Sequence, residues 1–467
     1  KELVVSFGSV IAGKQLNFEF WSTGLFYSSI YAIIFSFLCL SYSFYFSRKH
    51  AKWFPALAIV SVISPFYYSV FYYAVNIPVS DDYELIVDFA NNYSVADMSG
   101  KANLIFGQYY ECKFIFLRLI IAAQDFIFAK IDLRLLIYFS AFLLFAIAFM
   151  FYKCSRIKNI AVLLIIFILI FQWQYHGAVF WVIGGFPKFC VILFSMVSIY
   201  LIQKNTGKKF GWSALFALLA LFSFANGVLC FAFNLCILLL QKRKKESILW
   251  ILFSAAVLSF YFLYNYNHPG HLSLSISGLW KMVEYSLVFL GGCTQFTYRE
   301  FLPYLTGSLV WLILFYASYK KYFLKNPVIY FILLFIVGSS LLAALFRAEG
   351  NYATTQPLQT TYGIYSVSAI CCCFIFLMEE FNSAKRIVTV FLGVAVTYNL
   401  LCGIFFFPEN KYRKEYLSDC IYPWLLNEKE TAPYGCVWNS DPLLKQSEKY
   451  RQIINKAKEL RTFSPEI

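Results

Sequence analysis

Residues 327–346 read PVIYFILLFIVGSSLLAALF, a run of twenty residues without a charged side chain. A helix of about 20 apolar residues is long enough to cross the ~30 Å hydrocarbon core of a bilayer. Such a segment forms a helix because lipid offers its backbone groups no hydrogen-bond partners. The stretch therefore predicts a membrane-spanning helix.

The whole chain has the composition of a membrane protein. Hydrophobic residues make up 60% of its 467 residues, charged residues make up 14%, and the mean hydropathy is +0.64. Soluble domains carry about 25% charged residues, so a soluble domain is excluded. The net charge of +14 does not indicate a nucleic-acid partner, because the basic residues lie between the apolar runs and form no single patch.

Six basic clusters separate the apolar runs, and the positive-inside rule places them on the cytoplasmic side. The clusters are Arg48/Lys49/Lys52, Lys153/Arg156/Lys158, Lys204/Lys208/Lys209, Lys242/Arg243/Lys244/Lys245, Lys320/Lys321/Lys325 and Lys385/Arg386. We predict an all-α polytopic domain over 1–407 with about twelve spans, namely 24–46, 54–76, 133–152, 159–174, 187–203, 210–224, 227–240, 247–266, 303–319, 327–346, 362–380 and 386–407.

Successive cytoplasmic clusters must be separated by an even number of spans. The stretch 211–240 therefore holds two short helices that turn at Asn226-Gly227, a favourable turn pair. For the same reason 113–131 does not cross. Arg118 and Asp125 lie two turns apart on one face of it, which fits a helix in the membrane interface. The alternative is a tilted span in which these two residues form an ion pair.

The segments left on the opposite side face the periplasm if the chain is a bacterial inner-membrane protein. The first, together with the interfacial helix, forms a large loop over 77–132. The same parity places the N-terminus outside, with an interfacial N-terminal helix as the alternative, and 1–22 has no pattern of a cleavable signal peptide. The outer segments are 77–112, 175–186, 267–302, 347–361 and the tail 408–467.

The first outer loop opens with NIPVSDDYELIVDF at 76–89. Asp81 and Asp82 are adjacent, so repulsion raises their pKa values, and one of them could accept a proton from a sugar hydroxyl. The pair could instead hold a divalent cation, Mg²⁺ or Mn²⁺, through its oxygens. A third interpretation is a helix N-terminus that Ser80 or Asp81 caps.

An acidic pair in the first outer loop, followed by an interfacial helix and many spans, resembles the GT-C superfamily of membrane glycosyltransferases. Within it the chain is most similar to the serotype-converting O-antigen glucosyltransferases of enteric bacteria and their phages. The motif is SDDYE at 80–84, and the layout covers nearly the whole chain. In the family pattern an outer-loop Arg is followed by an Arg-Tyr pair. Arg347 fits the first element, whereas Thr361-Tyr362 stands in place of the second.

The resemblance implies an inverting hexosyltransferase at the periplasmic face of the inner membrane. Its partners would be an undecaprenyl-phosphate-linked hexose donor, the O-antigen of lipopolysaccharide as acceptor, membrane lipids, and the enzymes that make and flip the donor. It implies glucose as the sugar. The alternatives are an O-antigen polymerase and a transporter or flippase for polysaccharide or lipid-linked oligosaccharide. A transporter would carry ionisable residues inside its spans, and the spans here are nearly free of charge.

Basic residues on the outer side are candidates for the donor phosphate. Arg347 ends a span, and its planar fork suits bidentate contact with phosphate, although it could instead pair with Glu349. Lys188 could meet the phosphate as a point charge or extend to the headgroups. Arg299 is a third candidate.

Other residues on the predicted outer side are candidates for holding the sugar or the acceptor. Aromatic faces stack on sugar rings, and polar side chains bond the hydroxyl groups. An interfacial belt is the alternative for the aromatic residues. The candidates are Glu84, Trp173, Tyr175, His176 and Trp181.

The tail 408–467 is too polar to span the membrane. Apolar residues at helical spacing near its end predict an amphipathic helix that packs on the loops or lies on the membrane. On the oxidising side Cys420 and Cys436 predict a disulfide, and Cys112 with Cys293 is a second candidate pair. No metal site of histidines or cysteines is predicted, because no CxxC spacing occurs.

Overall fold

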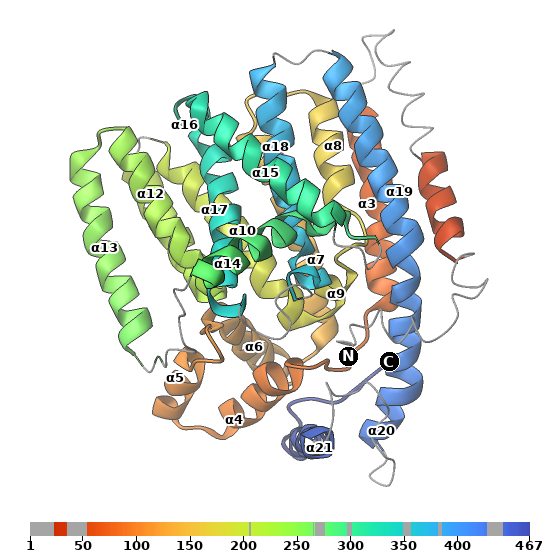
Figure 1. Cartoon of the computed structure of the whole chain (residues 1–467). Helices are drawn as coiled ribbons and strands as arrows, with labels where there is room; N and C mark the ends of the chain where they lie inside the picture. Colours follow the sequence, from red (N-terminus) through yellow and green to blue (C-terminus); the bar gives the residue numbers. More distant parts are fainter. Residues whose placement is uncertain are drawn as a thin grey trace.

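The structure, a computed structural model, is all-helical in the part of the chain that it describes, and no sheet occurs there. This agrees with the predicted all-α class. Most helices stand side by side in one bundle (Figure 1). The described residues are 23–34, 54–204, 207–264, 266, 276–296, 301–348, 356–381, 385–426 and 442–467.

Seven segments within these ranges are long and apolar enough to cross a membrane. Large apolar side chains of one of them, such as Ile248 and Leu252, are 59% and 62% exposed, a surface that suits lipid and not water. The chain is therefore a multi-pass membrane protein. The seven segments correspond to α7 (Leu133–Cys154), α10 (Val182–Ile202), α13 (Lys244–Leu263), α15 (Phe301–Tyr319), α17 (Pro327–Arg347), α18 (Gly363–Glu380) and α19 (Lys385–Tyr416).

Shorter helices occupy other predicted spans. Helices α11 and α12 meet at the turn η2 (Ala225–Gly227), where Asn226-Gly227 was predicted to turn the chain. Gly227 packs so closely on α11 that a Cβ there would lie 2.4 Å from the carbonyl carbon of Ala220. The shorter helices are Thr23–Ile34, α3 (Phe54–Tyr73), α8 (Ile160–Ile170), α11 (Gly207–Ser223) and α12 (Val228–Leu240).

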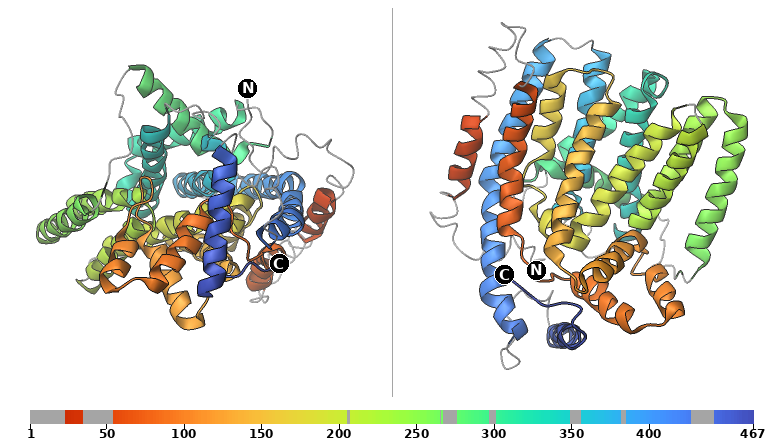
Figure 2. Two further views of the ribbon diagram at one scale, coloured as in Figure 1. Left: turned by 90° about the horizontal axis from the view of Figure 1, so that it is seen from below. Right: turned by 180° about the vertical axis from the view of Figure 1, so that it is seen from behind.

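The two ends of the bundle differ (Figure 1 and Figure 2). The turns that join α7 to α8, α12 to α13 and α15 to α17 lie at one end, and they carry basic clusters that were predicted to be cytoplasmic. Which end faces the cytoplasm stays a prediction. The opposite end, called the loop end below, is covered by α4 (Phe89–Val95), α5 (Met98–Phe106), α6 (Ile115–Phe128) and α21 (Pro442–Leu460).

Helix α6 falls within 113–131, and it lies across the loop end and not along the bundle (Figure 2). Its Arg118 is buried and donates to the carbonyl oxygens of Ile105, at 3.3 Å, and of Gly107. The partners of Arg118 are thus backbone carbonyls and not Asp125, so the alternative with an ion-paired tilted span was wrong.

The segment 267–302 was predicted as an outer loop, but it contains the helix α14 (Ile276–Gly291). This helix packs against α15 and α17. Its crossing with α15 is tight, because a Cβ on Gly291 or Gly307 would lie 1.7 or 1.9 Å from a carbonyl oxygen of the other helix. Charged residues interrupt its apolar run, which explains why hydropathy alone did not indicate a helix.

Helix α19 extends past the predicted end of its span at 407 and continues through Pro408 to Tyr416. The predicted boundary between membrane domain and tail therefore lies inside this helix. The amphipathic helix predicted at the end of the tail is α21. It packs on η1 (Tyr83–Asp88) and α4, so of the two predicted positions the one on the loops is observed.

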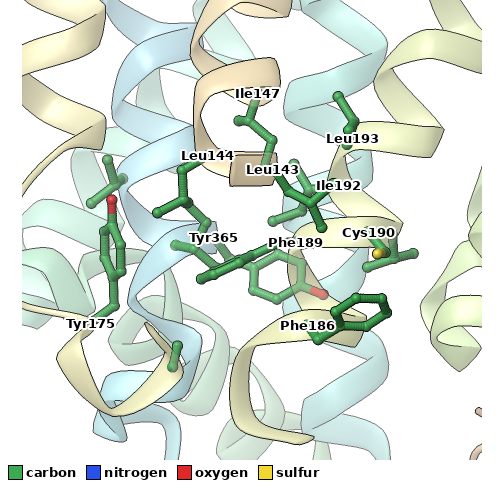
Figure 3. Close-up of a cluster of buried hydrophobic side chains, with 14 of the residues drawn as sticks. Leu143, Leu144, Ile147, Tyr175, Phe186, Phe189, Cys190, Ile192, Leu193 and Tyr365 are labelled. Carbon is green, nitrogen blue, oxygen red and sulfur yellow. The ribbon is translucent and has the colours of Figure 1, made fainter. Parts of the chain in front are cut away.

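Helix α10 runs through the middle of the bundle in contact with α7, α11, α12 and α17. It is buried along nearly its whole length. Its Phe186, Phe189 and Ile192 belong to one cluster of buried apolar side chains that also contains Leu144 of α7 and Tyr365 of α18 (Figure 3). The start of α10 is therefore a rigid platform at the inner side of the loop end.

Candidate functional site

The acidic doublet follows a strained residue. Ser80, directly before it, has a φ of 50°, a value that residues other than glycine rarely adopt. After the doublet the chain forms the π-helical turn η1. Strained residues and π-helical turns gather at functional sites, so the local backbone marks the doublet as a candidate site.

Asp82 is buried and ties the acidic loop to the start of α10. One carboxylate oxygen accepts a hydrogen bond from the backbone N–H of Ile183 at 3.1 Å, and the other accepts one from Val79 at 3.3 Å. The positive end of the α10 dipole stabilises an anion there. The predicted cap of the following helix by Ser80 or Asp81 was wrong, because Asp82 holds the N-cap position of that helix and no side chain caps it; Asp82 instead binds a backbone N–H at the start of α10.

The two aspartates have different surroundings. Burial raises the pKa of Asp82 to about 7, and its two backbone hydrogen bonds offset part of that rise. Burial also raises the pKa of Asp81, while the hydroxyl of Tyr109, 3.3 Å away, lowers it. Mutual repulsion was the predicted cause of raised pKa values, but burial is the larger cause. Asp81 is only half-buried, so it is the member of the pair that a ligand can approach.

Two of the three predicted phosphate ligands, Lys188 and Arg347, meet at one tyrosine. Lys188 of α10 is 6% exposed. Its ammonium donates to the carbonyl of Gly184 at 2.7 Å and lies 5.0 Å from the ring centre of Tyr362. Arg347, the last residue of α17, donates to the hydroxyl of Tyr362 and forms an ion pair with Glu111. Two cations are therefore held together inside the bundle.

These contacts bear on three sequence-based expectations, of which the one about Lys188 was wrong and the other two stay predictions. The carboxylate that meets Arg347 belongs to Glu111, whereas Glu349 lies outside the described residues. Lys188 does not extend to the headgroups, because its ammonium is bound inside the protein. Arg299 also lies outside the described residues, so its role stays a prediction.

The doublet and the two cations belong to one electrostatic cluster. Lys188 lies within Coulombic range of Asp81, Glu111 and Arg347. The acidic loop, the start of α10 and the end of α17 each contribute members. Asp81 therefore lies near Lys188, and Lys188 in turn lies near Arg347, so a carboxylate and two basic side chains gather at one place.

Sequence reasoning missed a further buried basic residue near the doublet, Arg413. It donates to the carbonyl of Phe180 at 2.6 Å and lies within Coulombic range of Asp82. Its Nη1 is buried without a hydrogen-bond partner among the described residues. The extension of α19 beyond 407 brings it there, and no local signal in the sequence indicated that extension.

Most of the predicted sugar-stacking residues are buried in the core. Trp173 is 1% exposed, donates to the hydroxyl of Tyr27 at 2.6 Å and stacks on Phe66. Tyr175 is fully buried. These rings form neither a sugar platform nor an interfacial belt in this structure.

His176 and Trp181 lie closer to the site. A ring nitrogen of His176 lies 3.2 Å from the carbonyl oxygen of Trp173, and burial lowers the pKa of His176 to about 4, so its ring is neutral at pH 7. Trp181 is half-buried and covers Gly184, where a Cβ would lie 2.6 Å from its ring. Of the four predicted side chains, Trp181 is the one whose ring remains partly accessible beside the cluster.

The C-terminal helix holds the acidic loop. Glu84 forms an ion pair with Lys449 of α21 at 2.9 Å. The rings of Tyr83 and Tyr450 stack with 4.2 Å between their centres. The side chain of Glu84 is therefore engaged by α21, and a role in binding the acceptor would require it to leave Lys449.

The predicted cation site does not fit the doublet. Among the described residues no three His, Cys, Asp or Glu side chains gather as metal ligands do. Both oxygens of Asp82 also accept backbone hydrogen bonds. A single remaining carboxylate is a poor site for Mg²⁺ or Mn²⁺.

The cysteines give one clear outcome. Cys112 and Cys293 are free and buried thiols, so the prediction that they pair was wrong. Cys420 is half-buried at the end of the α19 segment, and its predicted partner Cys436 lies outside the described residues. The disulfide between them stays a prediction.

Comparison of the chain with protein-family models, with curated proteins and with solved structures finds no match. The class of protein therefore follows from the fold alone, and it is a multi-pass membrane protein.

Proposed function

We propose that the chain is a membrane glycosyltransferase of the GT-C type, with about twelve spans, at the periplasmic face of the bacterial inner membrane. It moves one hexose, glucose by the resemblance, from undecaprenyl phosphate to the O-antigen of lipopolysaccharide. The observation that supports this proposal is the cluster of Asp81, Lys188 and Arg347 at the loop end of the bundle.

A lipid-linked donor suits the position of the two cations. Arg347 ends α17, and Lys188 lies in the second turn of α10, so both lie toward the loop end of the bundle. The guanidinium can bind phosphate bidentately, and the ammonium adds a point charge. Nucleotide sugars are absent from the periplasm, so a lipid is the chemically sensible carrier of the sugar.

In the proposed reaction Asp81 accepts the proton of the acceptor hydroxyl as that oxygen bonds to the anomeric carbon. The bond between the anomeric carbon and the phosphate oxygen breaks, and its electron pair leaves with the lipid phosphate. Arg347 and Lys188 stabilise the growing negative charge on the phosphate. This single displacement inverts the anomeric configuration. The raised pKa of Asp81 brings it closer to the working pH of a general base.

Asp82 acts as a positioning residue in this proposal. Its two backbone hydrogen bonds fix the acidic loop to α10, the helix that also carries Lys188. The position of Asp81 relative to Lys188 is therefore set through one helix, as catalysis by positioning requires.

The purified protein in lipid nanodiscs, incubated with polyprenyl-phosphate glucose and O-antigen, tests the proposal. Addition of single hexose branches to the acceptor supports it. Elongation of the O-antigen chain indicates a polymerase instead, and the absence of any covalent product indicates a transporter.

The variant Asp81→Asn tests the proposed base. We expect the rate of transfer to fall at least 100-fold while donor binding is retained, since general-base catalysis contributes about 10²–10⁴-fold. Asp97→Asn is the matched control, because Asp97 is exposed and caps α5, a task that Asn performs equally well. Near-normal transfer by Asp81→Asn would reject the assignment.

A further inference from the structure

The turn 109–112 joins the two halves of the candidate site. Backbone hydrogen bonds of 2.8 and 3.1 Å between Tyr109 and Cys112 close it, and Tyr110 at its tip has a φ of 48°. The hydroxyl of Tyr109 donates to Asp81 at 3.3 Å. Two residues further on, Glu111 forms the ion pair with Arg347. One closed turn thus contacts both the candidate base and the candidate phosphate ligand.

We propose, on the basis of the proposed function, that Glu111 occupies the guanidinium of Arg347 until the donor phosphate displaces it. We further propose that this displacement moves Tyr109 and so breaks its hydrogen bond to Asp81. A carboxylate and a phosphate need the same N–H groups of the guanidinium fork, so the donor must displace Glu111. Because the turn is closed by two hydrogen bonds, this displacement also moves Tyr109 away from Asp81. Glu111 and Tyr109 are therefore positioning residues that make the base available once the donor is bound.

The loss of the Tyr109 hydrogen bond has a direct chemical consequence. That bond lowers the pKa of Asp81, so its removal makes the carboxylate a stronger base and frees an oxygen for the acceptor hydroxyl. Two further contacts hold the rest of the turn. The hydroxyl of Tyr266 donates to the carbonyl of Glu111 at 3.2 Å, and the hydroxyl of Tyr261 accepts from the N–H of Lys113 at 3.2 Å. These two contacts anchor the C-terminal side of the turn, so the closed turn shifts as one unit about that side.

The affinity of the full chain in nanodiscs for farnesyl phosphate distinguishes this role from a structural one, because the two roles predict opposite changes in affinity when Glu111 is replaced. If Glu111 competes with phosphate, Glu111→Gln binds farnesyl phosphate about tenfold more tightly than wild type. If the ion pair only supports the fold, the same variant binds equally or more weakly, which overturns the inference. Glu448→Gln is the matched control, since Glu448 is exposed on α21 at the same end.

Labelling of Asp81 with a hydrophobic carbodiimide, followed by peptide mass spectrometry, tests the link through Tyr109. We expect farnesyl phosphate to increase the labelling of Asp81 at least threefold in wild type. Tyr109→Phe is expected to show the higher level with and without the ligand. If farnesyl phosphate does not change the labelling of Asp81 in wild type, the proposed coupling through Tyr109 is overturned.

The two proposals fail differently. If Arg347→Ala binds farnesyl phosphate as well as wild type does, the phosphate role in the proposed function fails, and the competition by Glu111 fails with it. If binding depends on Arg347 but Glu111→Gln does not tighten it, only the inference drawn here is overturned.

Discussion

Replacing Asp82 by Asn is expected to stabilise the protein above neutral pH and to weaken the pH dependence of its stability. The pKa of Asp82 is about 7 in the folded chain, against an ordinary value of 3.8. The folded state therefore binds this proton more tightly than the unfolded state. The stability that this group contributes is fully present below pH 3.8 and is lost as the pH rises to about 7.

The magnitude follows from the same values. A difference of about three pH units, at about 1.4 kcal/mol per unit, corresponds to a loss of about 4 kcal/mol above pH 7. Asn removes this loss, but its NH₂ group cannot accept the hydrogen bond from Val79, and an unpaired buried N–H costs about 1–3 kcal/mol. The net gain expected for Asp82→Asn at pH 8 is about 1–3 kcal/mol, and at pH 4 the variant is expected to be less stable than wild type.

Denaturant unfolding in detergent micelles, followed by tryptophan fluorescence from pH 4 to pH 8, measures the effect. The free energy of unfolding of wild type should fall steadily as the pH rises over this range. The corresponding curve for Asp82→Asn should be flatter and should cross the wild-type curve. Asp97→Asn, an exposed cap of α5, should follow wild type. Parallel curves for Asp82→Asn and wild type would refute the argument that burial raises the pKa of Asp82.

Three further predictions concern donor binding, the loop and the packing. Arg347→Ala is expected to weaken binding of farnesyl phosphate at least tenfold, because hydrogen bonds to charged groups contribute about 1.5–3 kcal/mol; unchanged affinity in a nanodisc titration contradicts the phosphate role. Tyr450→Ala removes a stacked ring worth about 1 kcal/mol and should speed hydrogen exchange in 83–88; unchanged exchange would mean that α21 does not hold the loop. Gly307→Ala should lower the thermal midpoint, because its Cβ would lie 1.9 Å from a backbone oxygen of α14. Gly393→Ala, with no atom within 4 Å, should not lower it, and equal midpoints would contradict the tight helix crossing.

The fold was predictable wherever local features decide it. Apolar runs of about twenty residues, basic clusters between them and the pair Asn226-Gly227 are visible without knowledge of the packing. Helix α14 was missed because Lys281 and Glu284 interrupt its apolar run, and its packing depends on the approach of Gly291 to α15 and of Gly307 to α14. These glycines have no distinctive local pattern, and only the folded chain brings them to the crossing.

The candidate site was predictable in its members but not in their pairing. Asp81, Lys188 and Arg347 stand out because charges near apolar spans are costly unless they have a task. Glu111 lies 236 residues from Arg347, so no local pattern links them. Nothing local separates Asp81 from Asp82 either, since the difference rests on a backbone N–H of α10 that lies 101 residues away.

A measurement of the side of the membrane on which the loop end lies tests the proposed function most directly. Tyr110 is 70% exposed at that end, and Lys242 is exposed at the opposite one. Single cysteines at these positions, in a chain free of other cysteines, can be labelled with a membrane-impermeant maleimide in intact spheroplasts. We predict that Tyr110→Cys is labelled before lysis and Lys242→Cys only afterwards. The reverse order would place Asp81 in the cytosol and contradict a transferase that uses a periplasmic lipid-linked sugar.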